Sequence, residues 1–133
     1  MAKRAVTERA RVRINELKPS SDFKVATRDL QEVHEILGLY LSEFPVPALA
    51  AEDIKPFLVR LKIQGASLEG EDFLIIKNMI ESFNRVYTFF KTHADRTPSI
   101  QDKLAHLEKN KTVPDEIDRV LDRRGVVKTS ASP

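Results

Sequence analysis

The sequence predicts an all-α fold, an irregular helical bundle of about five or six helices with a short C-terminal β-hairpin. Long stretches place apolar residues three and four positions apart, as one face of a helix requires. Charged residues make up 32% of the chain, above the average of about 25%, which suits helices with solvated faces. Only four glycines are present, too few for the frequent turns of a barrel or sandwich.

The first two predicted helices cover residues 4–17 and 22–44. The first ends before Pro19 and is only weakly amphipathic. The second has Ser21 as its expected N-cap and ends at Pro45, because proline has no backbone N–H to donate. We expect one apolar face of this second helix to point inward: Leu30, Val33, Leu37, Tyr40, Leu41 and Phe44, with Ile36 at its border.

A short helix over residues 53–62 comes next, capped by Asp53 and followed by Gly65 in the left-handed conformation. The helix over residues 68–93 carries the strongest pattern in the chain. Its apolar residues form two adjacent rows, the first of Phe73, Ile76, Ile80, Phe83, Tyr87 and Phe90, the second of Ile75, Met79, Val86 and Phe89. Together the two rows cover a wider arc of the helix circumference than the ~100° apolar stripe of a surface helix. We therefore expect this helix to be central and the most buried.

The last third of the chain predicts two more helices and the hairpin. Pro98 opens a helix that ends near residue 108, and Pro114 opens a second one with Ile117, Val120 and Leu121 facing inward. Gly125 then turns the chain into residues 126–129 (VVKT), the expected second strand of the hairpin. No internal repeat is visible, so residues 1–133 are expected to form a single helical domain.

Composition excludes several classes of protein. Cysteine is absent, which rules out disulfides, thiolate zinc sites and a cysteine nucleophile. The chain begins with charged residues, and its apolar runs are far shorter than the ~18 residues of a spanning helix. We therefore expect a cytoplasmic protein with no membrane partner. The 22 Lys and Arg against 20 Asp and Glu give a net charge of +2, which demands no polyanionic partner.

No pattern for catalysis or cofactor binding is present. The four glycines form neither a Walker-type nor a dinucleotide-binding loop, and the three histidines stand far apart in the sequence. Glu69, Glu71 and Asp72 could act as paired carboxylates in acid–base chemistry. Their position at the start of a helix favours the other interpretation, compensation of the helix dipole. We predict no catalytic, cofactor-binding or metal-binding residue in this chain.

The densest basic stretch is the first helix, with Arg9, Arg11 and Arg13. Arg9 and Arg13 share one helical face and are candidates for contact with the phosphates of a nucleic acid. Glu8 and Glu16 interrupt the positive field, and a solvated helix face is the alternative.

Four short motifs in a fixed order resemble the N-terminal region of the MutS family, in its second bacterial branch, the Smr-bearing MutS-II type. They are the turn at residues 15–22 (NELKPSSD), the helix start at residues 53–58 (DIKPFL), the cap at residues 65–69 (GASLE), and the terminal segment at residues 125–133 (GVVKTSASP), preceded by Ile117 and Asp118. The resemblance covers about residues 7–133. Arg9 and Ala10 depart from it, because the family usually has Leu-Gly at these two positions.

The resemblance implies that this chain is an N-terminal fragment of a larger MutS-like protein, a scaffold segment at the entry to the helical core and levers. Full-length members resemble homodimeric ATPases that use ATP and Mg²⁺, bind branched DNA, restrain recombination and in some bacteria act on stalled ribosomes and their rRNA. A C-terminal Smr domain supplies endonuclease activity. No catalytic residue of the family maps onto residues 1–133.

A different class of function is also open. The chain is alternatively a free-standing helical adaptor whose apolar face, formed by Ile75, Met79, Val86 and Phe89, binds a partner helix. Continuation of the reading frame past Pro133 into an ATPase supports the scaffold, whereas a stop codon supports the adaptor.

Overall fold

The computed structural model describes residues 5, 7–49 and 52–131, and these are all helical apart from connecting segments. The α-helices are α1 (Glu8–Asn15), α2 (Phe23–Leu41), α3 (Lys55–Arg60), α4 (Gly70–Thr92), α5 (Pro98–Leu104) and α6 (Thr112–Val120), with 3₁₀ turns η2 (Ala94–Arg96) and η3 (Thr129–Ala131). Residues 4 and 6 of the expected first helix lie outside the described residues.

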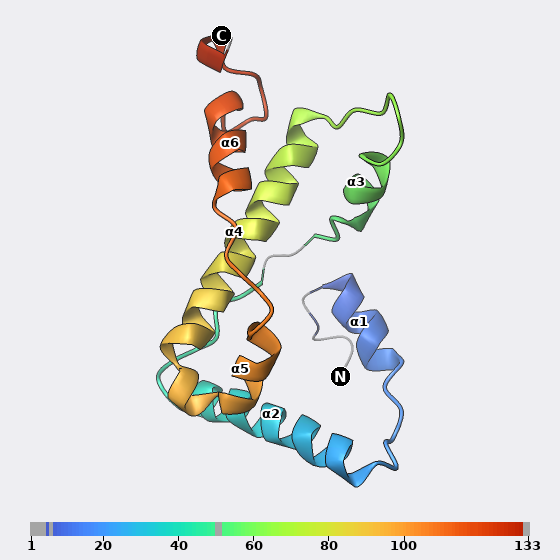
Figure 1. The fold of residues 1–133 in the computed structure, drawn as a ribbon, viewed down its shortest axis with the longest axis vertical. Coiled ribbons are helices and arrows are strands. Elements are labelled where there is room, and N and C mark those ends of the chain that lie inside the picture. The colour runs from blue at the N-terminus through green and yellow to red at the C-terminus, as the bar shows by residue number, and fades with distance from the viewer. Residues whose placement is uncertain (1–4, 6, 50–51, 132–133) are drawn as a thin grey trace.

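Helix α4 is the long central helix of the molecule (Figure 1), and α6 and α5 each pack along one half of it. Its N-terminus carries a capping box, in which the side chain of Asp72 accepts a hydrogen bond from the backbone N–H of Glu69 at 3.0 Å. This cap, with Glu71 beside it, agrees with the dipole interpretation of the three carboxylates. Gly65 has a φ of +80° and lies after α3, which confirms the predicted left-handed position.

One buried cluster lies where α2 and α5 meet the C-terminal half of α4. It consists of Leu39, Phe90, Ile100 and Leu104, with Ile36, Val46, Val86, Tyr87 and Phe89 packed around it. The other buried hydrophobic residues of the described core are Ile76 on α4 and, in and directly after α6, Ile117 and Leu121. The turn from α4 to α5 is held by Thr97, whose side chain is fully buried and donates to the carbonyl of His93 at 2.9 Å. Gln101 donates to the carbonyl of Phe90 at 2.9 Å, which ties α5 to the end of α4.

Helix α2 packs through a different face from the one predicted. The buried residues of α2 are Glu35 and Leu39, whereas Leu30, Val33 and Leu41 of the predicted face are 69%, 62% and 81% exposed. Glu35 is buried because it accepts a hydrogen bond from the backbone N–H of Ser99 at 3.2 Å, at the start of α5. The expected N-cap is also shifted by one residue, since Asp22 and not Ser21 accepts from the first backbone amides.

The predicted C-terminal β-hairpin is wrong. Among the described residues the only strand-like pairing is one isolated antiparallel bridge between Leu121 and Val127. The side chain of Asp122 accepts a hydrogen bond from the backbone N–H of Val126 at 2.9 Å. This N–H, next to the bridge, is therefore bonded within the turn and does not pair with a second strand. Helix α6 runs up to Val120 on one side of the bridge and η3 begins at Thr129 on the other, which leaves no residues to extend the ladder.

The chain exposes much more surface than a compact protein of its size. Its accessible surface is 10640 Å², whereas a compact monomer of 15.1 kDa exposes about 7,100 Å². Apolar residues contribute to this excess, because several large hydrophobic side chains on α2, together with Leu58 and Val59 on α3, are between 45% and 83% exposed. The described fold therefore leaves apolar faces that no element within it covers.

Candidate interaction surfaces

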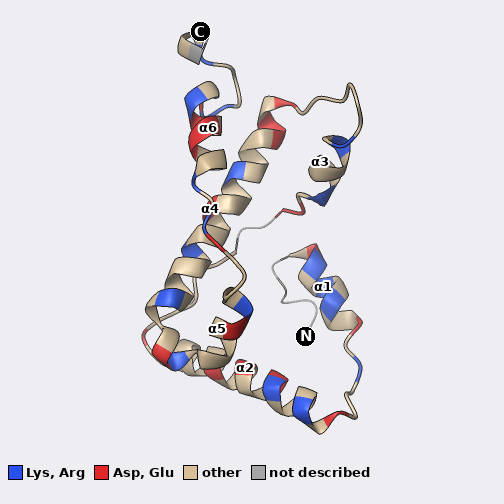
Figure 2. Cartoon of the chain, in the orientation of Figure 1, with Lys and Arg blue, Asp and Glu red and all other residues tan. Residues whose placement is uncertain are grey.

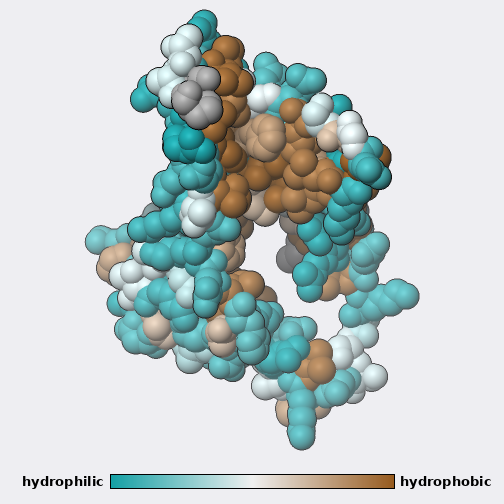
Figure 3. Space-filling model, turned by 45° about the horizontal axis from the view of Figure 1, so that its top comes forward, coloured by the Kyte–Doolittle hydropathy of each residue, from teal (hydrophilic) through white to brown (hydrophobic). Residues whose placement is uncertain are grey.

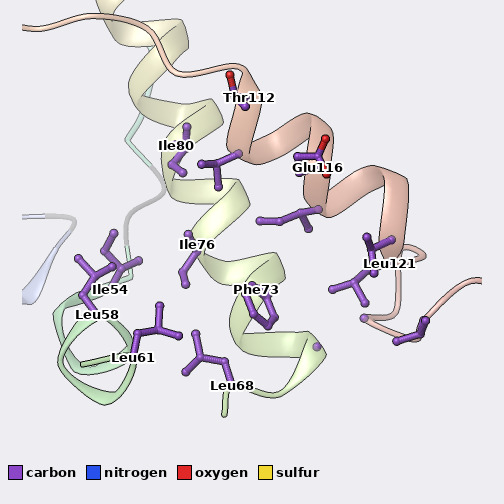
Figure 4. A pocket seen from close by; sticks show the side chains of 16 residues that line it. Ile54, Leu58, Leu61, Leu68, Phe73, Ile76, Ile80, Thr112, Glu116 and Leu121 are labelled. Carbon is purple, nitrogen blue, oxygen red and sulfur yellow. The ribbon is translucent and has the colours of Figure 1, made fainter. Parts of the chain in front are cut away.

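An apolar groove lies between α3, α4 and α6 (Figure 4). Its volume is about 700 Å³. The residues that line it are Ile54, Leu58, Leu61, Leu68, Gly70, Phe73, Ile76, Ile80, Thr112, Val113, Glu116, Ile117, Val120, Leu121, Gly125 and Val127. We call this hollow the α3–α4–α6 groove.

Three sequence features build the groove. On α3 and the residues beside it, Ile54, Leu58 and Leu61 are four and three positions apart and therefore face the same side of the helix. On the opposite wall, α6 presents Ile117, which is buried against α4. Phe73 lies on the floor between them (Figure 4), in the first turns of α4. The wall contributed by α3 is open, since Leu58 is 45% exposed.

The end of the groove is closed by a direct contact between two glycines. The backbone of Gly70, the first residue of α4, lies against the backbone of Gly125 in the turn after α6. A Cβ on Gly70 would lie 1.8 Å from the carbonyl oxygen of Gly125, so no other residue fits here without moving the turn. Gly125 itself has a φ of +77°, which favours glycine.

The groove is almost purely apolar. Its polar side chains are Thr112 and Glu116, both on α6. Small-molecule sites combine an apolar lining with a few convergent polar groups that fix the orientation of the ligand. This lining suits the apolar side chains of another helix better than a polar metabolite, and Figure 3 shows it as a continuous hydrophobic area.

The predicted nucleic-acid contacts lie on α1, apart from the groove (Figure 2). Arg9, Arg11 and Arg13 are all exposed, and α1 has no buried residue. Arg11 donates to the side chain of Glu8 at 3.3 Å and to the carbonyl of Ala5 at 3.2 Å, so its charge is partly used within the helix. Arg9 and Arg13 lie one helical turn apart, and no ion pair of either is found within the described residues.

Of the three histidines, His93 has structural contacts. His93 ends α4, where its Nδ1 lies 2.8 Å from the carbonyl oxygen of Phe89 and its ring contacts the rings of Phe44 and Phe89. His34 and His106 are exposed. Within residues 5, 7–49 and 52–131, no group of three or more His, Asp or Glu side chains could hold a metal ion, and no helix could span a membrane.

Glu35 is the one buried charged side chain among the residues that the structure describes, and its role is structural. Burial acts to raise its pKa, but hydrogen bonds from Ser99, Gln31 and the backbone of Ile100 outweigh burial and hold the pKa below its ordinary range. Glu35 therefore stays ionised and satisfies the amides at the start of α5 from a different helix. Its neighbour Glu32 pairs with Lys103 at 2.5 Å, which adds a second link between α2 and α5.

The chain is 23% identical over 120 residues to Endonuclease MutS2 of Alkaliphilus metalliredigens (strain QYMF) and 26% identical over 125 residues to Endonuclease MutS2 of Alkaliphilus oremlandii (strain OhILAs). It is similar to part of MutS2. The matches cover 89% and 92% of this chain, but only 15% and 16% of the two relatives. No family profile and no solved structure matches the chain.

The groove and the exposed face of α2 were not predicted as surfaces. The spacing of Ile54, Leu58 and Leu61 was a visible signal for an apolar face on α3. The face of the alternative adaptor is not the one left open, since Val86 and Phe89 pack against the core. The open wall of α4 is the other apolar row, with Phe73, Ile76 and Ile80.

Proposed function

We propose that this chain is a non-catalytic scaffold segment of a larger, MutS2-like DNA-processing protein. The observation that carries the proposal is the excess of exposed surface, 10640 Å² against about 7,100 Å² for a compact protein of this mass. A segment that packs inside a larger structure has such open apolar faces, whereas a free monomer rarely exposes large apolar patches. The similarity to about one-sixth of MutS2 supports the same conclusion.

In this proposal the α3–α4–α6 groove receives an apolar helix from the rest of the same protein. Most of the length of the two relatives lies outside the matched region, so a longer protein has ample chain to supply this helix. The groove is long enough to be lined by three elements and offers almost no polar partner, which fits the apolar stripe of a helix. Burial of Leu58 and Leu61, each about half exposed, would stabilise the contact.

The chemistry belongs to other parts of the longer protein. The sequence of this chain contains no phosphate-binding glycine loop, so we propose that ATP and Mg²⁺ bind outside it. We likewise propose branched DNA as the substrate of the whole protein, with ribosomal RNA as a second partner and a homodimer as its assembly. Within this chain, Arg9 and Arg13 are the residues we propose for contact with phosphates.

The reading frame downstream of the codon for Pro133 tests the scaffold proposal. We expect the frame to continue into a protein with a nucleotide-binding loop of the G-x-x-x-x-G-K-[ST] type. A stop codon directly after Pro133 would contradict the proposal and leave the free-standing adaptor, which would then use the α3–α4–α6 groove for a partner from another chain.

A further inference from the structure

Helix α3 is held much more weakly than the other two sides of the α3–α4–α6 groove. None of its six residues is buried. Helix α6, in contrast, buries Pro114 and Ile117, and α4 buries Ile76 on the floor. A helix shorter than about 12–15 residues is marginal by itself and depends on packing for its stability. The groove therefore has a fixed floor and one fixed wall, whereas little packing holds the wall formed by α3.

A single ion pair is the polar link between α3 and the rest of the groove. The guanidinium of the half-exposed Arg60 lies 3.7 Å from the carboxylate of Asp72, in the first turn of α4. Within the described part of the chain, no other ion pair or side-chain hydrogen bond joins α3 to α4 or α6. An ion pair with an exposed partner contributes little to stability. Helix α3 is therefore attached to α4 at one weak point.

The connections on both sides of α3 leave it free to move. Gly65 has a φ of +80°, and no atom lies within 4 Å of the position that a Cβ would take, so the chain turns there in open space. The backbone hydrogen bonds of residues 61–66 go to residues three or four positions back, and none joins this segment to α4 or α6. Residues 42–49 and 52–54, on the other side, contain no helix or strand. Movement of α3 thus breaks no backbone pairing with its neighbours.

We propose that α3 is a lid that opens about Gly65 and closes over the occupant of the α3–α4–α6 groove. The structure shows the latched state, in which Arg60 pairs with Asp72. In the open state this pair breaks, and the lid carries Leu58 away from the floor of the groove (Figure 4). An incoming helix then enters from the side. The use of the lid rests on the proposed function, whereas the motion is a property of this chain alone.

Burial of apolar area couples the lid to the occupant. Leu58 and Leu61 are 45% and 50% exposed in the latched state, although they line an apolar groove. Opening breaks one weak ion pair and uncovers leucines that are already half exposed, so its cost is small and both states are populated. An apolar occupant covers both leucines only in the latched state, and this difference in burial shifts the population toward that state.

Distances between spin labels on α3 and α6 test the lid, and the absence of cysteine leaves only the introduced sites to be labelled. Val59→Cys and Asp115→Cys place the labels at exposed positions that do not line the α3–α4–α6 groove. Lys91→Cys with Asp115→Cys, which joins α4 to α6, is the matched control pair. In double electron–electron resonance we expect two distance populations for the α3–α6 pair and one narrow population for the control pair.

The latch is tested by a second pair of variants. Arg60→Ala removes the ion pair and should raise the ratio of open to latched molecules by about two- to fivefold. Lys62→Ala removes a nearby exposed cation for which no ion pair is found among the described residues, and it should leave the ratio unchanged. Circular dichroism verifies that the labelled variants keep the helical content of the parent.

The apolar dye anilinonaphthalene sulfonate serves as the probe for closure. Saturating dye should shift the α3–α6 distances toward the latched population, and Leu58→Glu should abolish the shift. One narrow α3–α6 distance without dye, equal ratios in Arg60→Ala and Lys62→Ala, or distances that do not respond to the dye would each overturn the lid. Because this test uses a dye and not the downstream polypeptide, the lid and the scaffold proposal can fail separately.

Discussion

Gly70→Ala should destabilise the fold even though alanine is normally the better helix residue. The new Cβ would lie 1.8 Å from the carbonyl oxygen of Gly125 and 2.7 Å from its carbonyl carbon. Because close C···O contacts lie near 3.3–3.6 Å, the turn after α6 has to move by about 1.5 Å or more. That movement would break the backbone hydrogen bonds from Asp122 to Val126 and from Lys128 to Val120, each 2.8 Å.

The expected cost follows from these contacts. Two hydrogen bonds contribute about 1 kcal/mol each, and forced overpacking costs about 1–3 kcal/mol. The gain in helix propensity returns at most about 1 kcal/mol, so Gly70→Ala should lower the free energy of unfolding by about 2–4 kcal/mol. Gly38→Ala is the matched control, because nothing lies within 4 Å of a Cβ added there, inside α2. It should raise stability by about 0.5–1 kcal/mol.

Thermal and urea unfolding, followed by circular dichroism at the helix band, measure both variants. With about 3–6 °C per kcal/mol for a chain of this size, Gly70→Ala should lower the melting temperature by roughly 10 °C and Gly38→Ala should raise it by a few degrees. If the two substitutions shift stability in the same direction, the close approach of α4 and the turn after α6 is wrong.

Three further predictions concern charge and ligands. Glu35→Gln should be less stable than the parent at neutral pH. Because the pKa of Glu35 in the folded state lies below its ordinary value of 4.5, the difference in stability is present above pH 4.5 and disappears as the pH falls through the folded pKa. Unfolding curves recorded from pH 7 down to pH 3 measure this difference. The isolated chain should neither bind ATP in calorimetry nor cleave DNA with Mg²⁺ or Mn²⁺, and micromolar ATP affinity would refute this. Nucleic-acid binding should be weak and independent of sequence, and a plot of log affinity against log salt concentration from gel-shift titrations should have a slope of roughly −2 to −3. Charge reversal of Arg9 and Arg13 together should abolish this binding, whereas charge reversal of Lys55 and Lys62 should matter less. Tight binding to branched DNA at high salt would show that this chain is itself a recognition module.

Local patterns were sufficient to predict the helices. The two apolar rows of residues 68–93 predicted the long central α4, and the position of Gly65 after a short helix predicted its positive φ. Both features depend on neighbours in the sequence, namely helical periodicity and a helix end. The sequence predicted a hairpin after α6 because residues 126–129 have strand-forming side chains. The structure has only an isolated bridge there, since the side chain of Asp122 accepts hydrogen bonds from the backbone N–H groups of Arg124 and Val126 and so holds these residues in a turn.

Packing between distant segments could not be predicted in the same way. The pattern of α2 was interpreted on the assumption that apolar residues point inward, and it identified the face of Leu30 and Leu37 as core. The observed face of α2 instead contains the buried Leu39 and a polar contact, in which Glu35 accepts a hydrogen bond from the backbone N–H of Ser99, 64 residues away in the chain. A carboxylate inside a helix gives no sequence signal that it will cap another helix. The groove has the same origin, since it exists only where α3, α4 and α6 come together.

Binding of the polypeptide encoded downstream of Pro133 to this chain is the most direct test of the scaffold account. The two pieces, expressed separately and mixed, should form a stable 1:1 complex. Leu58→Glu should abolish it, while Val59→Glu on the same helix should not, because Val59 is similarly exposed, at 52%, but does not line the α3–α4–α6 groove. A complex that tolerates Leu58→Glu, or no complex at all, would contradict the account.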